Sequence, residues 1–215
     1  MFKRKVFIAG ATGRVAEETI KNLVQLGHQV TAGARQPERV IALDKVNPVK
    51  LDLHADVKEL AELVKDHDAV YFLAGSRGKD LLQTDAFGAV KLMQAAEASQ
   101  VKRFVLLSSI FATEPEKWSD PNLVNITDYN IAKFFADQWL IHNTTLDYTI
   151  VQPGNLVEAE TGSGLIELNV KQSQPNTIPN VAEVLATVLD KKNTYAQIIQ
   201  MSDGETPISQ AVSSI

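Results

Sequence analysis

The feature that most constrains the fold is a glycine-rich segment near the start of the chain. Residues 10–16 read Gly-Ala-Thr-Gly-Arg-Val-Ala, which is the spacing G-x-x-G-x-x-A. Residues 6–9 before it are continuously apolar, and apolar residues recur after it at three- and four-residue intervals. A buried strand, a glycine turn and an amphipathic helix in this order predict the first βα unit of an α/β protein.

Each position of the turn has a physical reason. Gly10 permits a tight turn, Gly13 lets the backbone approach a ligand closely, and Ala16 allows the helix to pack on the sheet. The start of the helix supplies free N–H groups and positive potential for a pyrophosphate. An unrelated glycine turn is the alternative. We expect a dinucleotide to contact Gly10, Ala11, Thr12, Gly13, Arg14 and Val15.

The same alternation of apolar runs and helical periods continues along the chain. It predicts further strands at residues 28–34, 49–53, 69–74, 104–107, 148–151 and 196–201, and helices at 15–24, 37–43, 57–65, 81–99, 127–142, 181–189 and after 207. Six βα repeats predict a doubly wound, Rossmann-type, mostly parallel sheet with helices on both faces. We expect one domain over residues 1–215, in which residues 155–215 form a short substrate-side extension.

Composition excludes several classes of function. The net charge of −5 argues against a nucleic-acid partner, which needs a concentrated basic face. The chain has no cysteine, so disulfides and thiolate metal sites are absent and a reducing, cytoplasmic location is expected. The four histidines are scattered, which predicts no metal site. No run is apolar enough to predict a membrane span, and the apolar start is too short for a signal peptide.

The end of the second predicted strand indicates which dinucleotide is bound. NAD-selective sites carry an acidic residue there for the ribose hydroxyls, but residues 31–35 read Thr-Ala-Gly-Ala-Arg. The guanidinium of Arg35 can pair with a 2′-phosphate, and Arg39 lies one helical turn further on. Two solvated arginines are the alternative. The pattern favours NADP(H) over NAD(H), with Asp52 and Leu53 beside the adenine.

These residues, together with Tyr129-Asn-Ile-Ala-Lys133, resemble the atypical NAD(P)H-binding branch of the short-chain dehydrogenase/reductase superfamily, which includes NmrA-like and biliverdin reductase B-like proteins. The resemblance implies that Ala74, Gly75 and Ser76 lie beside the nicotinamide ribose and that Pro153 and Gly154 pack against the nicotinamide. It also implies that Ser108 and Ser109 end a strand at the cofactor, and that Ser109, Tyr129 and Lys133 are catalytic. Asp85 stands where extended relatives often carry an asparagine.

The expected chemistry follows from the spacing of the tyrosine and the lysine. Residues four apart on a helix project from one face, so Tyr129 and Lys133 can meet the same ligand. A phenol is a weak acid at neutral pH, and a nearby ammonium group makes it a better proton donor. Lys133 would also hold the nicotinamide ribose, and Ser109 would polarise a substrate carbonyl. A half-buried structural tyrosine is the alternative.

The substrate is less defined by the sequence. Residues 112–126 form a polar stretch that could cover the pocket or be an exposed loop, and Phe111, Trp118 and Asn155 are candidate substrate contacts. We expect an NADP(H)-dependent oxidoreductase that acts on a small carbonyl, quinone or flavin-like molecule. Two alternatives remain open: an NmrA-like regulator that senses NADP(H) without turnover, and a nucleotide-sugar epimerase or dehydratase.

Overall fold

The computed structural model describes residues 3–215, and most of its strands belong to one sheet. The strand order is β11-β8-β10-β6-β5-β4-β1-β2-β3. The seven parallel strands are β1 (Lys5–Ala9), β2 (Gln29–Ala34), β3 (Val46–Lys50), β4 (Ala69–Phe72), β5 (Arg103–Leu107), β6 (Asp147–Pro153) and β10 (Gln197–Asp203). The short strand β8 (Leu165–Leu168) is antiparallel to β10 and to β11 (Thr206–Pro207).

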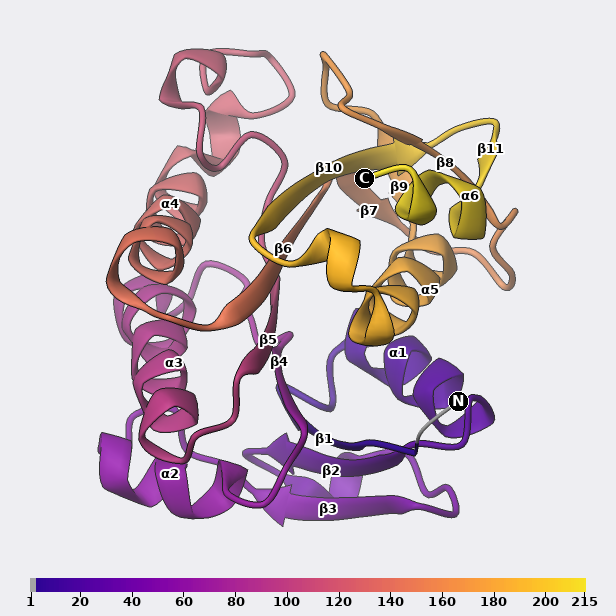
Figure 1. Cartoon of the computed structure of the whole chain (residues 1–215). Coiled ribbons are helices and arrows are strands. Elements are labelled where there is room, and N and C mark those ends of the chain that lie inside the picture. The colour runs from indigo at the N-terminus through magenta and orange to yellow at the C-terminus, as the bar shows by residue number, and fades with distance from the viewer. Residues whose placement is uncertain (1–2) are drawn as a thin grey trace.

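Helices cover both faces of this sheet, as Figure 1 shows. One face carries α1 (Arg14–Gln25), α5 (Ile178–Thr187) and α6 (Ile208–Ser213), and the other carries α2 (Val57–Val64), α3 (Ala89–Ala98) and α4 (Thr127–Asn143). Each helix set has its own apolar core, because the strands of the sheet are buried on both sides and separate the two clusters. The predicted doubly wound α/β fold is confirmed.

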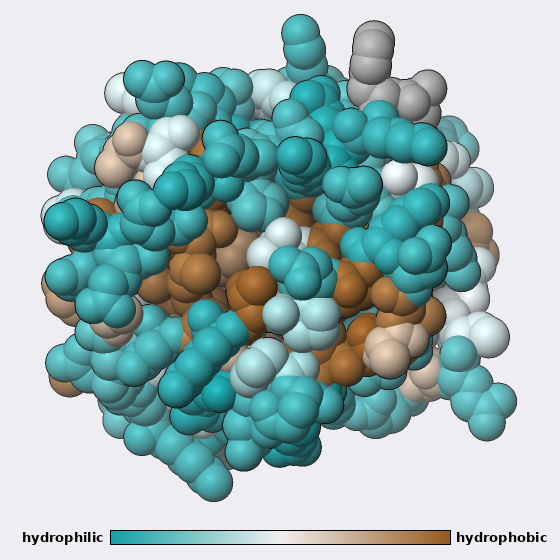
Figure 2. Space-filling view, turned by 90° about the horizontal axis from the view of Figure 1, so that it is seen from below, coloured by the Kyte–Doolittle hydropathy of each residue, from teal (hydrophilic) through white to brown (hydrophobic). Residues whose placement is uncertain are grey.

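The third strand was predicted in the wrong place. It spans Val46–Lys50 rather than residues 49–53. Leu51 and Leu53 are buried, which mimics a strand, but β3 ends at Lys50 and the Leu51 N–H makes a last hydrogen bond to the Ala34 carbonyl of β2. Pro48 lies inside β3, and it is tolerated because β3 has only β2 as a neighbour. The edge strand and α2 lie at the bottom of Figure 1, and Figure 2 shows that face with hydrophilic side chains around a central apolar area.

Two predicted helices also differ from the structure. The helix expected at residues 37–43 is only a 3-10 turn at Pro37–Arg39, after which Val40 is extended and buried against the core. The helix expected at residues 81–99 begins as a π-helix, Leu81–Gly88, before α3. Turns closed by i→i+5 bonds leave the 3.6-residue phase of an α-helix, and Leu82 in this segment is 74% exposed.

The region after β6 contains strands that no periodicity indicated. β7 (Asn155–Val157) and β9 (Pro175–Thr177) form a separate two-stranded parallel sheet. Strands of two to four residues are too short for a readable alternation, which is why they were missed. None of the helices in residues 3–215 is long and apolar enough to cross a membrane.

Candidate functional site

A cleft of about 860 Å³ lies at the carboxyl ends of the central parallel strands. Open α/β sheets bind ligands at this edge, where the loops from neighbouring strands meet. Segments that are far apart in the sequence form its walls: Gly13, Arg14 and Val15 after β1; Leu73, Ala74, Gly75, Arg77, Gly78 and Leu81 after β4; Leu107, Ser108, Ser109 and Ile110 after β5; residues 122–129 and Lys133; and Pro153, Gly154, Asn155, Leu156 and Ser173.

The glycine loop opens the cleft at one end. Gly10 has a φ of +87°, and a Cβ there would lie 2.5 Å from the Cα of Ala74, so only glycine fits against the end of β4. The N–H groups of Gly10 and Ala11 donate to the Gly33 carbonyl at 3.0 and 3.1 Å, which anchors the loop to β2. Gly10, Ala11 and Thr12 are not in the cleft lining, unlike the three residues that follow them.

The first turn of α1 is free to receive an anion. Gly13, the residue before the helix, makes no side-chain cap, so the first N–H groups of α1 lack a capping partner at the cleft. Arg14 adds a positive charge at the same end. Its Nη1 pairs with Glu158 Oε1 at 2.5 Å, and both side chains are more than half exposed. Free amides and a guanidinium at a helix N-terminus fit a pyrophosphate.

The residues predicted to select the cofactor lie outside the lining of this cleft. Arg35 follows β2 and is exposed, and the nearby Arg39 donates to the Gln36 side chain at 3.1 Å. Asp52 accepts from the His54 amide at 2.9 Å and therefore caps a turn. Leu53 packs into the core on the α2 and α3 face rather than on the surface.

The loop after β4 brings an acidic side chain toward Arg35. Asp80 accepts hydrogen bonds from Thr84 and from His54, the latter at 2.7 Å. These bonds and, to a smaller extent, the charge of Arg35 lower the pKa of the Asp80 carboxyl. The His54–Asp80 contact thus joins the turn after β3 to the loop after β4, and the charge of Arg35 after β2 acts on the same carboxyl.

The end of β4 carries an unusual buried carboxylate. Asp85, on the π-helical turn, accepts from the Ser76 amide at 3.0 and 3.3 Å and is fully buried. The Ser76 hydroxyl is buried without a partner in the described chain, and Ala74 and Gly75 line the cleft beside it. Buried polar atoms without partners are rare, so Ser76 Oγ marks a position where a ligand could bond.

Helix α4 presents the tyrosine and the lysine to the cleft, as their spacing predicted. Lys133 is 1% exposed, and its Nζ donates to the Leu107 carbonyl at 3.0 Å. The same Nζ lies 5.5 Å from the centre of the Tyr129 ring and 5.7 Å from that of Phe72. The carbonyl at the end of β5 therefore orients the ammonium group beside the Tyr129 ring.

The two serines after β5 have different partners. Ser109 Oγ donates to Asn130 Oδ1 at 2.8 Å, and Ser108 Oγ donates to Asp137 Oδ2 at 2.7 Å. Asn130 and Asp137 are both fully buried on α4. No sequence motif indicated either of them, although Asn130 follows Tyr129 and Asp137 lies one turn after Lys133.

Asp137 joins the ends of two strands under the cleft. Its Oδ2 accepts hydrogen bonds from Ser108, which follows β5, and from Gln152 of β6 at 2.9 Å. Its Oδ1 has no partner within residues 3–215. Burial raises the pKa of Asp137 to about 7, although the two hydrogen bonds and the charge of Lys133 oppose this shift. The carboxyl therefore titrates near neutral pH.

The segment after β6 closes the other wall. Gly154 donates to Asn176 Oδ1 at 2.7 Å, and a Cβ at Gly154 would lie 1.9 Å from the Gln174 carbonyl oxygen. Only glycine can let β9 pass this close to β6. Pro153 and Gly154, expected from the resemblance to contact the nicotinamide, and Asn155, a candidate substrate contact, all line the cleft.

Two of the expected substrate contacts do not reach the cleft. Phe111 is buried with Ile110, Leu123 and Val170, and Trp118 donates its indole N–H to the Phe111 carbonyl at 2.9 Å. Residues 122–126, from the same connection, line the cleft instead. The prediction was wrong about Phe111 and Trp118 because it took large aromatic side chains as ligand contacts, whereas Phe111 belongs to a small buried cluster and Trp118 packs edge-on against Phe134.

The geometry can therefore hold a dinucleotide and a small molecule. Open helix amides, glycines that let strands approach closely and the unpartnered Ser76 hydroxyl fit a ligand extended along the strand ends. No cluster of three or more histidine, cysteine or acidic side chains suited to a metal occurs in residues 3–215. Ser109, Tyr129 and Lys133, whose side chains carry hydrogen-bond donors, line the same cleft.

Known proteins show the same combination of fold and sequence. A family model described as NAD(P)H-binding matches residues 10–192. The chain is 44% identical to the oxidoreductase ylbE from Lactococcus lactis, with a TM-score of 0.95 over 98% of this chain and 96% of that one. It is 31% identical to the uncharacterized sugar epimerase YhfK of Bacillus subtilis over 97% of this chain and 98% of the relative.

A solved short-chain dehydrogenase/reductase from Veillonella parvula, determined in complex with NADP, has the same fold. Its TM-score is 0.77 at 17% identity, over 95% of this chain and 97% of that one.

Proposed function

The chain belongs to the NAD(P)H-binding family, of the atypical short-chain dehydrogenase/reductase type, and we propose that it is an NADP(H)-dependent oxidoreductase. The substrate class is a small carbonyl, quinone or flavin-like molecule. The observation that carries this proposal is that Ser109, Tyr129 and Lys133 line one cleft with the N-terminus of α1. Binding groups for a dinucleotide and proton donors for a substrate thus share one continuous space.

Lys133, Ser109 and Tyr129 each have a defined task in this reaction. NADPH supplies the hydride when it is bound. Lys133, oriented by the Leu107 carbonyl, holds the ribose side of the cofactor. Ser109 donates a hydrogen bond to the substrate oxygen, and Tyr129 transfers its phenolic proton to that oxygen. The residues around the cleft floor, such as Leu107 and Ile110, exclude water from the reacting groups.

The preference for NADP(H) is tested at Arg35. Replacing Arg35 with Asp removes a cation and adds an anion where the 2′-phosphate is expected, so NADPH affinity should fall by a factor of about 100. NADH affinity should change by less than about threefold, because NADH lacks that phosphate. Fluorescence titration of both cofactors with the wild-type and R35D proteins measures the two effects.

Lys192→Asp is the matched control for Arg35→Asp. Lys192 is exposed in the 3-10 turn Lys192–Thr194 and lies outside the cleft lining. Its replacement by Asp changes the net charge by the same two units as Arg35→Asp. Its effect on NADPH affinity should be small at physiological salt. An equal loss of NADPH and NADH affinity in R35D would contradict the assignment of Arg35 to the 2′-phosphate.

Turnover is tested at Tyr129. The Tyr129→Phe variant keeps the ring beside Lys133 but loses the transferable proton, so kcat should fall by a factor of about 10²–10⁴. NADPH affinity should be retained. The assay follows NADPH oxidation with a panel of aldehydes, ketones, quinones and flavins. Tyr148→Phe, a partly buried tyrosine on β6, is the control and should keep the wild-type rate.

The alternatives give different results in the same assay. An epimerase, the activity named for YhfK, would interconvert a nucleotide sugar with no net oxidation of NADPH. A sensor of the NmrA type would bind NADPH tightly while the whole panel failed to accelerate its oxidation. Either outcome in the wild-type protein would contradict the proposed oxidoreductase activity.

A further inference from the structure

The hydroxyl of Ser109 points away from the position where the proposed reaction needs it. Ser109 lines the cleft, but its single proton is donated to Asn130 Oδ1 at 2.8 Å. A serine hydroxyl carries one proton and cannot donate to Asn130 and to a substrate carbonyl at the same time. In this arrangement Ser109 offers the cleft only lone pairs, which repel a carbonyl oxygen.

The other end of the Asn130 side chain has no partner. Asn130 is 0% exposed, and its Nδ2 makes no hydrogen bond within residues 3–215. A buried donor left unpaired is destabilising, because it has lost its hydrogen bonds to water. Asn130 therefore has an unpaired donor next to the reacting groups, since it follows Tyr129 directly in the chain.

Turning the Asn130 amide by 180° frees the Ser109 proton and gives Nδ2 a partner, while Oδ1 takes the unpaired position. The two ends of a carboxamide are nearly equal in size, so the reversed amide fits the same space. Nδ2 then donates to Ser109 Oγ, and the Ser109 proton is free to point into the cleft. The arriving carbonyl supplies the acceptor that makes this second arrangement favourable, which is a shift between two states of one hydrogen-bonded pair.

We propose that Asn130 is a positioning residue that directs the Ser109 proton toward the substrate carbonyl by reversing its side-chain amide. The proposal rests on the proposed function, because it assigns a second state to the same site. Neither state changes the backbone, since both partners are fixed by α4 and by the end of β5. Asn130 itself does not touch the substrate.

Asn130→Asp tests the proposal directly. An ionised carboxylate only accepts hydrogen bonds, so the Ser109 proton stays on it and kcat should fall by a factor of about 10²–10³, as for the loss of one donor to the substrate oxygen. Lowering the pH should restore the rate, because the protonated carboxyl can donate to Ser109 Oγ. The KM for NADPH should not change. Recovery at low pH is a readout that a purely structural role of Asn130 would not produce.

Two further variants keep the test decisive if N130D folds poorly. Asn130→Ala removes the competing acceptor and should reduce kcat by no more than about tenfold, although it removes more packing than N130D does. In a Ser109→Ala background, N130D should have no further effect on kcat, because the hydroxyl that it traps is already gone. Asn143→Asp, an exposed change at the end of the same helix, is the matched control and should be neutral.

The outcomes separate this inference from the proposed function. An active wild-type protein with N130D as slow as S109A, N130A faster than both and recovery at low pH supports the inference. An active wild type in which N130D keeps its rate, or in which N130A is the slower variant, overturns the inference alone. A wild-type protein that is inactive with the whole panel overturns the proposed function, and the inference with it.

Discussion

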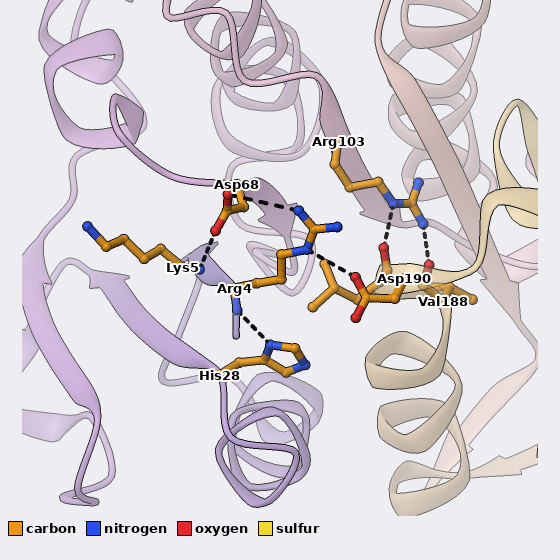
Figure 3. A network of polar contacts seen from close by, with 8 residues as sticks. Arg4, Lys5, His28, Asp68, Arg103, Val188 and Asp190 are labelled. Atoms are coloured by element: carbon orange, nitrogen blue, oxygen red, sulfur yellow. Dashed lines mark hydrogen bonds and ion pairs between the residues drawn. The ribbon is translucent and has the colours of Figure 1, made fainter. Parts of the chain in front are cut away.

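The two ends of the parallel sheet differ in how many of their buried polar groups have hydrogen-bond partners. At the amino end, charged side chains are satisfied by carboxylates and by backbone carbonyls of the chain itself (Figure 3). At the carboxyl end, four of the five buried side-chain atoms without a partner in residues 3–215 belong to residues that lie next to the cleft lining without being part of it: Ser76 Oγ, Asn130 Nδ2, Asp137 Oδ1 and Asn176 Nδ2. Most buried polar groups at the amino end are thus paired, whereas the carboxyl end retains unpaired donors and acceptors.

Arg103 shows how the amino end is satisfied. Its guanidinium donates to the carbonyls of Val188, Leu189 and Asp147 at 2.7, 3.3 and 2.8 Å, and it lies 4.6 Å from the centre of the Tyr195 ring. A cation at the carbonyl end of a helical segment is favourable. These bonds attach the segment after α5 to the start of β5.

Arg4 repeats this pattern nearer to the surface. It pairs with Asp190 at 3.0 Å and with Asp68 at 4.0 Å, and its backbone N–H donates to His28 Nδ1 at 3.1 Å. Burial lowers the pKa of His28, which keeps the ring neutral as an acceptor. Only His28 Nε2 lacks a partner at this end of the described chain. Along the strand direction, the paired polar groups thus lie at the amino ends, and most of the unpaired ones lie at the carboxyl ends beside the cleft.

The largest test of this contrast is at Asp137. Its folded-state pKa of about 7 lies above the ordinary value of 3.8, so the folded protein favours the protonated carboxyl. The wild-type free energy of unfolding should therefore fall as the pH rises from about 4 to about 7, by up to about 4 kcal/mol in total. The Asp137→Asn variant should lack this pH dependence. Its stability relative to the wild-type protein should therefore be greater at pH 8 than at pH 4.

Urea denaturation across this pH range measures the effect. Asp128→Asn, an exposed carboxylate change on the same helix, should leave the pH dependence of the wild-type protein unchanged. Parallel curves for the wild-type and D137N proteins would mean that Asp137 is no less satisfied than the groups of the amino end, and the contrast would fail at its clearest residue.

The smaller test is at Arg103. Arg103→Met keeps much of the side-chain volume but leaves three carbonyls without their donor, so the free energy of unfolding should fall by about 3 kcal/mol. NADPH affinity of the folded variant should be retained, because Arg103 does not line the cleft. Denaturation and cofactor titration on the same sample distinguish the two quantities.

Arg4→Met is the matched control, since Arg4 belongs to the same network but has a side chain that is 40% exposed. Its loss should cost less than about 1 kcal/mol. A variant R103M that kept its stability and lost NADPH affinity would reverse the assignment of the amino end as the structural one.

Much of this molecule was predictable from local sequence. The strand, glycine turn and helix around Gly10 needed only an apolar run, a spacing and a helical period, all of which are local properties. The four-residue spacing of Tyr129 and Lys133 likewise placed both side chains at the cleft. The strands β7 and β9 could not be predicted, because they are held by contacts with Gly154 and with each other rather than by their own pattern.

The sequence by itself determined the alternation of strands and helices, the glycine loop and the helix face that carries Tyr129 and Lys133. Only the tertiary structure decided that Ser109 meets Asn130, that Asp137 joins β5 to β6, and that Phe111 and Trp118 pack away from the cleft. The reason is physical: periodicity records which side of an element faces the core, whereas hydrogen-bond partners depend on which elements become neighbours in space.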